Sequence, residues 1–146
     1  MNTLVLQIAF SEYGVKEYPG EKHNPKVLKY FTGIGCIWVK DDETAWCSAF
    51  VNWVCKGAGL EYSGKLNARS WLDVGENIQY PQLGDIVVLW RENKNSWKGH
   101  VGFYINETTK HIYILGGNQN NQVCIMAYNK NRLLSYRRLH MRKLDI

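Results

Sequence analysis

The sequence predicts an α+β fold in which helices from the first half of the chain pack on an antiparallel sheet built from the second half. Before Pro81 the apolar residues recur at helical spacing, whereas after it they lie in short runs of β-branched and aromatic side chains. The turns between these runs are short and polar, which favours an antiparallel meander. With 146 residues the chain can bury a core without disulfide staples, and we expect one domain spanning residues 1–146.

Four helices are expected. The first spans residues 3–13 and ends near Gly14. The second begins at Asn24-Pro25, because asparagine is a good N-cap and proline suits the first helical position, and glycines at 33 and 35 end it. A short helix from Asn67 to about Leu72 follows later in the chain.

The most strongly patterned helix runs from Thr44 or Ala45 to Lys56, and Gly57 and Gly59 end it. Its apolar residues fall on one stripe, the pattern of a helix that packs on a core. The stripe consists of Cys47, Phe50, Val51, Val54 and Cys55.

Five strands are expected after Pro81, each a short β-branched or aromatic run bounded by polar turns. They are residues 85–91, 100–105, 111–115, 122–127 and 134–138.

The net charge of +5, with a basic stretch over residues 132–143, favours an anionic partner. No zinc-finger spacing, RNA-binding signature or long basic helix points to nucleic acid. The sequence has no run of about 20 apolar residues, so membrane insertion is not expected. The first ten residues lack a basic segment and carry Gln7 within a short apolar run, so no signal peptide is expected. We expect a protein that is cytoplasmic when made.

Cys47 is the strongest candidate for chemistry, because it lies in the first turn of the best-patterned helix. Unpaired N–H groups and the positive end of the helix dipole favour a thiolate there, and the same N–H groups can hold an oxyanion. The other cysteines, Cys36, Cys55 and Cys124, form no CxxC pair and are expected to be small buried hydrophobes.

His100 opens a strand in which alternation puts it on one face with Gly102 and Tyr104, while Val101 and Phe103 face the core. The neighbouring glycines leave room for a close approach by another chain. A histidine in this place can exchange a proton with a thiol.

Asn118 lies on the next strand. If the hairpin between the two strands is centred on Thr108 or Thr109, Asn118 shares the face of His100, directly across or on the diagonal. Its amide can then accept from the imidazole and fix its tautomer. A slip of one residue puts Gln119 on that face instead, so the choice between Asn118 and Gln119 stays open.

Four motifs in this order resemble those of the CHAP/NlpC-type cysteine peptidases, in a bacterial and phage subgroup with a Gly-Gly-Asn-Gln signature. They are WCSAFVNW at 46–53, LGDIVVL at 83–89, GHVGFY at 99–104 and LGGNQ at 115–119. The segments GVKE at 14–17, HNP at 23–25 and YRR at 136–138 also fit, so the resemblance covers nearly the whole chain.

The resemblance implies a papain-like α+β fold and a cysteine amidase or endopeptidase that acts on peptidoglycan stem peptides. It implies Cys47 as nucleophile, His100 as base and acid, and Asn118 as the residue that orients His100. Oxyanion donors are expected near the helix start. Where many CHAP enzymes carry a glutamate two residues before the asparagine, this chain has Gly116.

No cofactor or metal is expected. Some relatives bind calcium through acids before the cysteine, but the adjacent Asp41, Asp42 and Glu43 lack alternating ligand spacing. A zinc site from Cys47, His100 and Cys36 or His23 lacks closely spaced ligands.

Two other functions remain: hydrolysis of an amide or isopeptide outside the cell wall, and wall binding without catalysis. The sequence leaves open which bond is cut and the oligomeric state. It also does not distinguish a phage lysin from an autolysin or an antibacterial toxin with an immunity protein. Absence of a signal peptide favours delivery to the wall or periplasm by a holin or secretion system.

Overall fold

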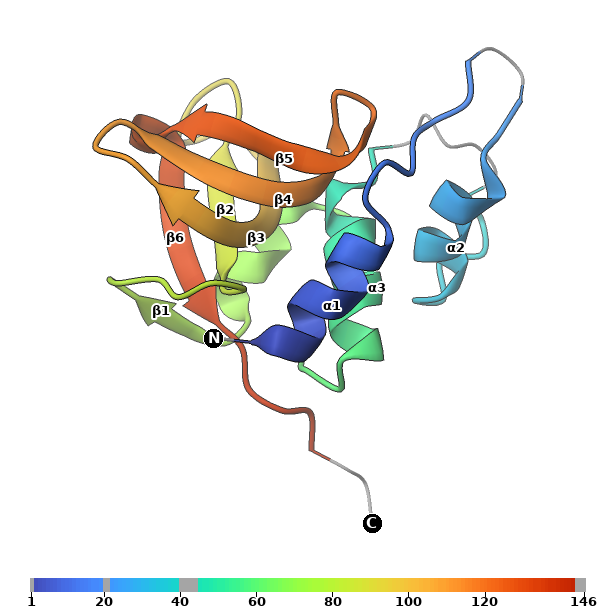
Figure 1. Cartoon of the computed structure of the whole chain (residues 1–146), viewed down its shortest axis with the longest axis horizontal. Helices are drawn as coiled ribbons and strands as arrows, with labels where there is room; N and C mark the ends of the chain where they lie inside the picture. The colour runs from blue at the N-terminus through green and yellow to red at the C-terminus, as the bar shows by residue number, and fades with distance from the viewer. Residues whose placement is uncertain (1, 20–21, 40–44, 144–146) are drawn as a thin grey trace.

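A computed structural model describes residues 2–19, 22–39 and 45–143 of the chain. Three helices gather on one side of a curved sheet (Figure 1). In chain order the elements are α1 Thr3–Ser11, α2 Pro25–Thr32, α3 Cys47–Gly57, the 3-10 helix η1 Ala68–Asp73, β1 Glu76–Ile78, β2 Ile86–Trp90, β3 Gly99–Glu107, β4 His111–Gln119, β5 Gln122–Asn129, the 3-10 helix η2 Lys130–Arg132 and β6 Leu133–Arg138. The expected α+β class is confirmed.

The expected helices are present with shifted ends. Helix α2 starts as its sequence predicts, because the side chain of Asn24 accepts the Lys26 N–H and proline occupies the first turn. Helix α3 begins at Cys47, and its N-cap, Trp46, makes no side-chain capping bond. Thr44, one of its expected starting residues, lies outside the described residues. The short fourth helix is a 3-10 helix.

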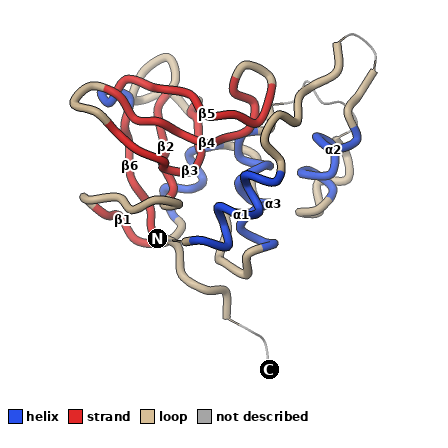
Figure 2. The backbone as a smooth tube through the Cα atoms, viewed as in Figure 1, coloured by secondary structure: helices blue, strands red, loops and turns tan. Residues whose placement is uncertain are grey.

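The six strands pair antiparallel in the order β1-β6-β2-β3-β4-β5. The expected meander therefore holds from β2 to β5 only, since β6 returns to pair with β2 (Figure 2). Strand β2 is therefore central, with β3 on one edge and β6 on the other, and its residues Ile86 to Leu89 are fully buried. Strand β1, which the sequence analysis missed, pairs with the outer edge of β6.

The sheet buries both faces. One face packs on α3 and the other helices through residues such as Val88, Val101 and Phe103. The other face closes on itself around a smaller cluster, because the sheet is strongly curved. That cluster consists of Val87, Leu89, Tyr104, Ile112, Ile114, Tyr128 and Tyr136. In the part of the chain that is described, no helix is long and apolar enough to cross a membrane.

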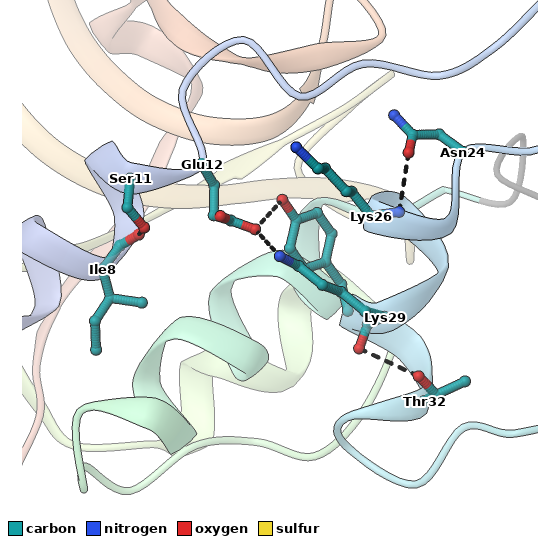
Figure 3. A network of polar contacts seen from close by, with 8 residues as sticks. Ile8, Ser11, Glu12, Asn24, Lys26, Lys29 and Thr32 are labelled. Atoms are coloured by element: carbon teal, nitrogen blue, oxygen red, sulfur yellow. Dashed lines mark hydrogen bonds and ion pairs between the residues drawn. The ribbon is translucent and has the colours of Figure 1, made fainter.

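A polar network joins α1 to α2 beside the main core (Figure 3). Glu12, at the end of α1, accepts a hydrogen bond from Tyr30 Oη at 3.0 Å and forms an ion pair with Lys29. The Tyr30 ring in turn stacks on Trp46 at a centroid distance of 5.8 Å. The network therefore fixes the aromatic residue that immediately precedes Cys47.

Two of the motifs quoted above join β6 to the segments that precede its neighbours β1 and β2. Arg138, on β6, forms an ion pair with Asp85 before β2, with Nη2 2.8 Å from Oδ2. Arg137 donates to the carbonyl oxygens of Val74 and Gly75. These two arginines of the basic C-terminal stretch therefore have structural partners.

Gly117 tests how tightly α3 packs on β4. A Cβ atom at this position would lie 2.7 Å from the Trp46 ring and 2.8 Å from Phe50 Cβ, in a fully buried contact. We expect Gly117→Ala to lower the free energy of unfolding by about 1–3 kcal/mol, the usual cost of overpacking. Urea denaturation measures this change. Gly57→Ala is the matched control, because its Cβ would meet only Ile8 at 3.5 Å, and an unchanged stability in Gly117→Ala would contradict the packing.

Candidate active site

Cys47 is the first residue of α3, and its side chain is 6% exposed. Its sulfur lies within reach of the backbone N–H groups of Cys47 and Ser48 and of the N–H of Val101 on β3. Val101 follows His100 directly, so the start of the helix and the start of the strand meet at the thiol.

Burial raises the pKa of the Cys47 thiol above its ordinary value. The Val101 N–H, the Arg91 guanidinium and the N–H groups at the helix start act in the opposite direction and offset only part of this effect. The sequence analysis expected the helix start to favour a thiolate. In the closed site the desolvation cost is larger, and the thiol keeps its proton.

His100 is fully buried, and both of its ring nitrogens have polar neighbours. Its Nε2 lies 2.8 Å from Gln119 Oε1 and 3.2 Å from Tyr128 Oη. Its Nδ1 lies 3.4 Å from Nη2 of Arg91, whose charge also acts on Cys47. The Tyr128 ring packs against the imidazole at a centroid distance of 5.1 Å.

The hydrogen bonds of Gln119 assign the tautomer of His100. Gln119 Nε2 donates to the backbone carbonyl oxygens of Ile114 and Cys124, at 3.1 and 2.7 Å, and only an N–H group can serve both. Oε1 therefore faces the imidazole, and His100 Nε2 must carry the proton. Arg91 can only donate, which is consistent with a bare Nδ1. The imidazole is thus neutral, with its lone pair on the side of Arg91.

Gln119, rather than Asn118, contacts His100, so the expected geometry is corrected. The pairing of Phe103 with Leu115 gives the register that the sequence analysis used. The pairing of β4 with β5 then shifts between Gly116 and Gln119, and Asn118 adopts a left-handed φ of 56°. This bulge shifts the alternation by one residue and brings Gln119 onto the face of His100.

The two glycines before Asn118 make room for this arrangement. A Cβ atom at Gly116 would lie 2.7 Å from Gln119 Oε1, so the carboxamide occupies the space above the glycine. Gly117 has no side chain and so leaves room for the Trp46 ring and for Phe50 of α3. Position 116 therefore carries no carboxylate, and the Gln119 carboxamide occupies the space that a side chain at this position would need.

The pKa of His100 is lowered from 6.5 to about 4, mainly by desolvation and also by the charges of Arg91 and Arg132, while the Gln119 hydrogen bond acts in the opposite direction. At neutral pH the free protein therefore holds a neutral thiol and a neutral imidazole, and the Arg91 charge acts on both groups.

A buried polar network sets the position of α3, and the sequence analysis missed it. Ser48 Oγ donates to the Lys65 carbonyl at 2.7 Å and accepts from Trp71 Nε1 at 3.0 Å. Asn52, one turn on, donates to the same carbonyl and accepts from the Gly64 N–H at 2.9 Å. Ser48 and Asn52 lie four residues apart on α3, and that spacing was the only signal in the sequence.

The segment 14–17 holds the site from another side. It pairs with the turn after β4 through backbone hydrogen bonds between Val15 and Val123 and between Glu17 and Asn121. The Glu17 carboxylate also accepts from Trp46 Nε1 at 2.7 Å. The same short segment thus positions the residue before Cys47 and the turn after Gln119.

The tryptophans differ in exposure: Trp46 and Trp71 belong to the core, whereas Trp97 is 73% exposed. Cys36 and Cys55 are buried as expected, but Cys124 is only partly buried and its thiol donates to the Gln119 carbonyl. Asp41, Asp42 and Glu43 lie outside the described residues. Within the ranges described, no three His, Cys, Asp or Glu side chains form a group able to hold a metal ion.

The chain matches the CHAP domain family over residues 39–118, more than half of its length. That range includes Cys47 and His100 and ends one residue before Gln119. No curated protein has significant sequence similarity to the chain.

Two solved structures share the fold. One, from Staphylococcus aureus subsp. aureus Mu50, is described as similar to lipoprotein, NLP/P60 family, and has a TM-score of 0.53 at 17% identity. The likeness covers 92% of this chain but only 40% of the staphylococcal chain. The other is RipD from Mycobacterium tuberculosis, with a TM-score of 0.52, 21% identity, and coverage of 98% of this chain and 97% of that one. RipD is described as a non-catalytic NlpC/p60 domain protein adapted to peptidoglycan binding.

The lowered pKa of His100 predicts a pH dependence of stability. The unfolded chain protonates His100 below about 6.5 and the folded chain only near 4, so the stabilisation is complete above 6.5 and is lost as the pH falls toward 4. Between pH 7.5 and 4.5 we expect the wild type to lose about 2.5 kcal/mol more unfolding free energy than His100→Gln. Denaturant titrations at both pH values measure this difference. Equal losses in the two proteins would show that His100 titrates normally in the fold.

Proposed function

Because this chain belongs to the CHAP domain family, we propose that it is a cysteine hydrolase that cleaves amide bonds in peptidoglycan peptides. The observation that carries the proposal is the 2.8 Å hydrogen bond between His100 Nε2 and Gln119 Oε1. It holds the imidazole in the tautomer whose Nδ1 can accept a proton, which in the proposed reaction comes from Cys47.

In the proposed reaction His100 Nδ1 takes the proton of Cys47 as the sulfur attacks the carbonyl carbon of the amide. A C–S bond forms, and the tetrahedral intermediate collapses as His100 returns the proton to the leaving nitrogen and the C–N bond breaks. Water, deprotonated by His100, then attacks the thioester. The acid leaves, and Cys47 recovers its proton.

Backbone groups at the start of α3 suit the negative oxygen of the intermediate. The N–H groups of Cys47 and Ser48 already face the sulfur, and neither has a partner within the first helical turn. The helix dipole adds a partial positive charge at the same end. We therefore assign these two N–H groups as the oxyanion donors.

Peptidoglycan as the substrate is supported by the family and by the net charge of +5, which favours an anionic polymer. The likeness to RipD favours a second candidate, peptidoglycan binding without catalysis. The two candidate functions differ in whether Cys47 acts as a nucleophile, and this difference can be measured.

The first test digests purified sacculi and identifies released fragments by mass spectrometry. We expect the wild type to release peptide fragments and Cys47→Ala to lose at least about 10³-fold of that activity, because the nucleophile is gone. Cys36→Ala is the matched control, as it removes a buried thiol elsewhere. Equal release by the wild type and Cys47→Ala would overturn the mechanism. Binding of sacculi without release would favour the non-catalytic candidate.

The second test separates Gln119 from Asn118. We expect Gln119→Ala to lower kcat about 10²-fold, the low end of what positioned acid–base catalysis contributes, because the imidazole loses its orienting acceptor. Asn118→Gly keeps the left-handed backbone and should retain activity within about twofold. Steady-state kinetics on a defined stem peptide measure both. The opposite pattern would make Asn118 the orienting residue.

A further inference from the structure

Two arginines lie beside His100. The Arg91 guanidinium approaches His100 Nδ1, at 3.4 Å. The Arg132 guanidinium covers the Tyr128 ring at 5.4 Å, and that ring packs on the imidazole. Arg132 Nε also donates to the carbonyl of Trp90, the residue before Arg91, at 3.1 Å. Both cations therefore gather at one end of β2, next to the candidate site.

Neither arginine has an acidic partner among the described residues. The acids nearest in sequence are engaged elsewhere, since Glu92 pairs with Lys98 and Glu107 with Lys130. Both arginines are partly buried, and both nitrogens Nη1 and Nη2 of Arg132 lack a hydrogen-bond partner in the described part of the chain. Two cations held close together without an anion are unfavourable in the free protein.

At the imidazole these charges oppose the proposed chemistry, although the Arg91 charge also favours the Cys47 thiolate. Acyl transfer needs His100 to accept a proton, and a cation on either side of the imidazole disfavours the imidazolium. An anion bound between the arginines would remove this opposition when it arrives. A guanidinium presents parallel N–H groups that match the two oxygens of a carboxylate.

We propose that Arg91 and Arg132 form a carboxylate subsite, so that the preferred substrate carries a free carboxylate next to the amide bond that is cleaved. This inference rests on the proposed function, whose site it extends. The carboxylate neutralises the two cations as it binds, and the imidazole can then take the proton of Cys47. Recognition of the substrate and proton acceptance by His100 are therefore coupled.

The loop that carries Arg91 is built to hold this position. Arg69 donates to the carbonyl oxygens of Asn93, Lys94 and Lys98, at 2.9, 2.7 and 2.9 Å. The Arg91 N–H also donates to the Lys98 carbonyl at 3.2 Å. Arg91 thus extends from a braced connection between β2 and β3.

The first test uses two alkylating reagents that differ only in charge, iodoacetate and iodoacetamide. The measured quantity is the rate of alkylation of Cys47 by iodoacetate divided by its rate with iodoacetamide. We expect this ratio to be at least about tenfold higher than the same ratio for free cysteine, because the subsite concentrates the anion. Peptide mass mapping assigns the label to Cys47, with Cys36, Cys55 and Cys124 as internal references.

Variants attribute the preference to the subsite. Arg91→Gln and Arg132→Gln should each reduce the normalised ratio several-fold and the double variant should bring it to about one, whereas Arg91→Lys retains part of it. Lys94→Gln, in the same loop and exposed, is the matched control and should keep the wild-type ratio. A wild-type ratio near one, or an equal fall in Lys94→Gln, would overturn the proposal.

The second test uses stem peptides with D-isoglutamate, which has a free α-carboxylate, or D-isoglutamine, its carboxamide. We expect kcat/KM at least about tenfold higher for the acid, and loss of this preference in Arg91→Gln and Arg132→Gln. Equal cleavage of both peptides by the wild type would exclude a carboxylate subsite for that bond. Because the alkylation ratio needs no peptide cleavage, a high ratio without hydrolysis would contradict the proposed function and leave the subsite standing.

Discussion

The side-chain amide of Gln119 is the contact on which the candidate site depends. Its nitrogen must donate to the carbonyls of Ile114 and Cys124, while its oxygen must accept from His100. A carboxylate could satisfy the imidazole but would face the two carbonyls with no proton to give. A carboxamide meets both demands, which explains why this chain orients its histidine with a neutral group.

The local sequence around Gln119 follows from that demand. Gly116 leaves space for the carboxamide, Gly117 for the aromatic rings before and within α3, and Asn118 tolerates the left-handed backbone that turns the strand. Each residue of the motif has a separate physical cause. The segment 14–17 then secures the following turn and Trp46 together, so the two halves of the chain are held in place at the site.

Much of this arrangement could be predicted from the sequence. Helical spacing located α3 and its buried stripe, and alternation located Val101 and Phe103 in the core. The register that placed Asn118 opposite His100 follows the observed pairing of Phe103 with Leu115. The bulge was missed because it depends on how close α3 comes to Gly117, a tertiary contact that alternation does not encode. The return of β6 to β2 was missed for a similar reason, since connections between distant strands leave no local pattern.

The protonation states of Cys47 and His100 differ from those that the helix start and the neighbouring cation would favour if each acted alone. A helix start and a neighbouring cation favour a thiolate, yet burial raises the pKa of Cys47 and lowers the pKa of His100, leaving two neutral groups. A site in this state is less exposed to oxidation and alkylation, because the thiolate is the reactive form.

The bracing of the β2–β3 connection by Arg69 has an evolutionary consequence. Arg69 binds only main-chain carbonyls there, so the hydrogen bonds persist whatever side chains residues 93, 94 and 98 carry. Ligand preference at this edge can therefore diverge by substitution in the loop without a new scaffold. Selection can vary what this edge of the site binds while the framework that presents it stays the same.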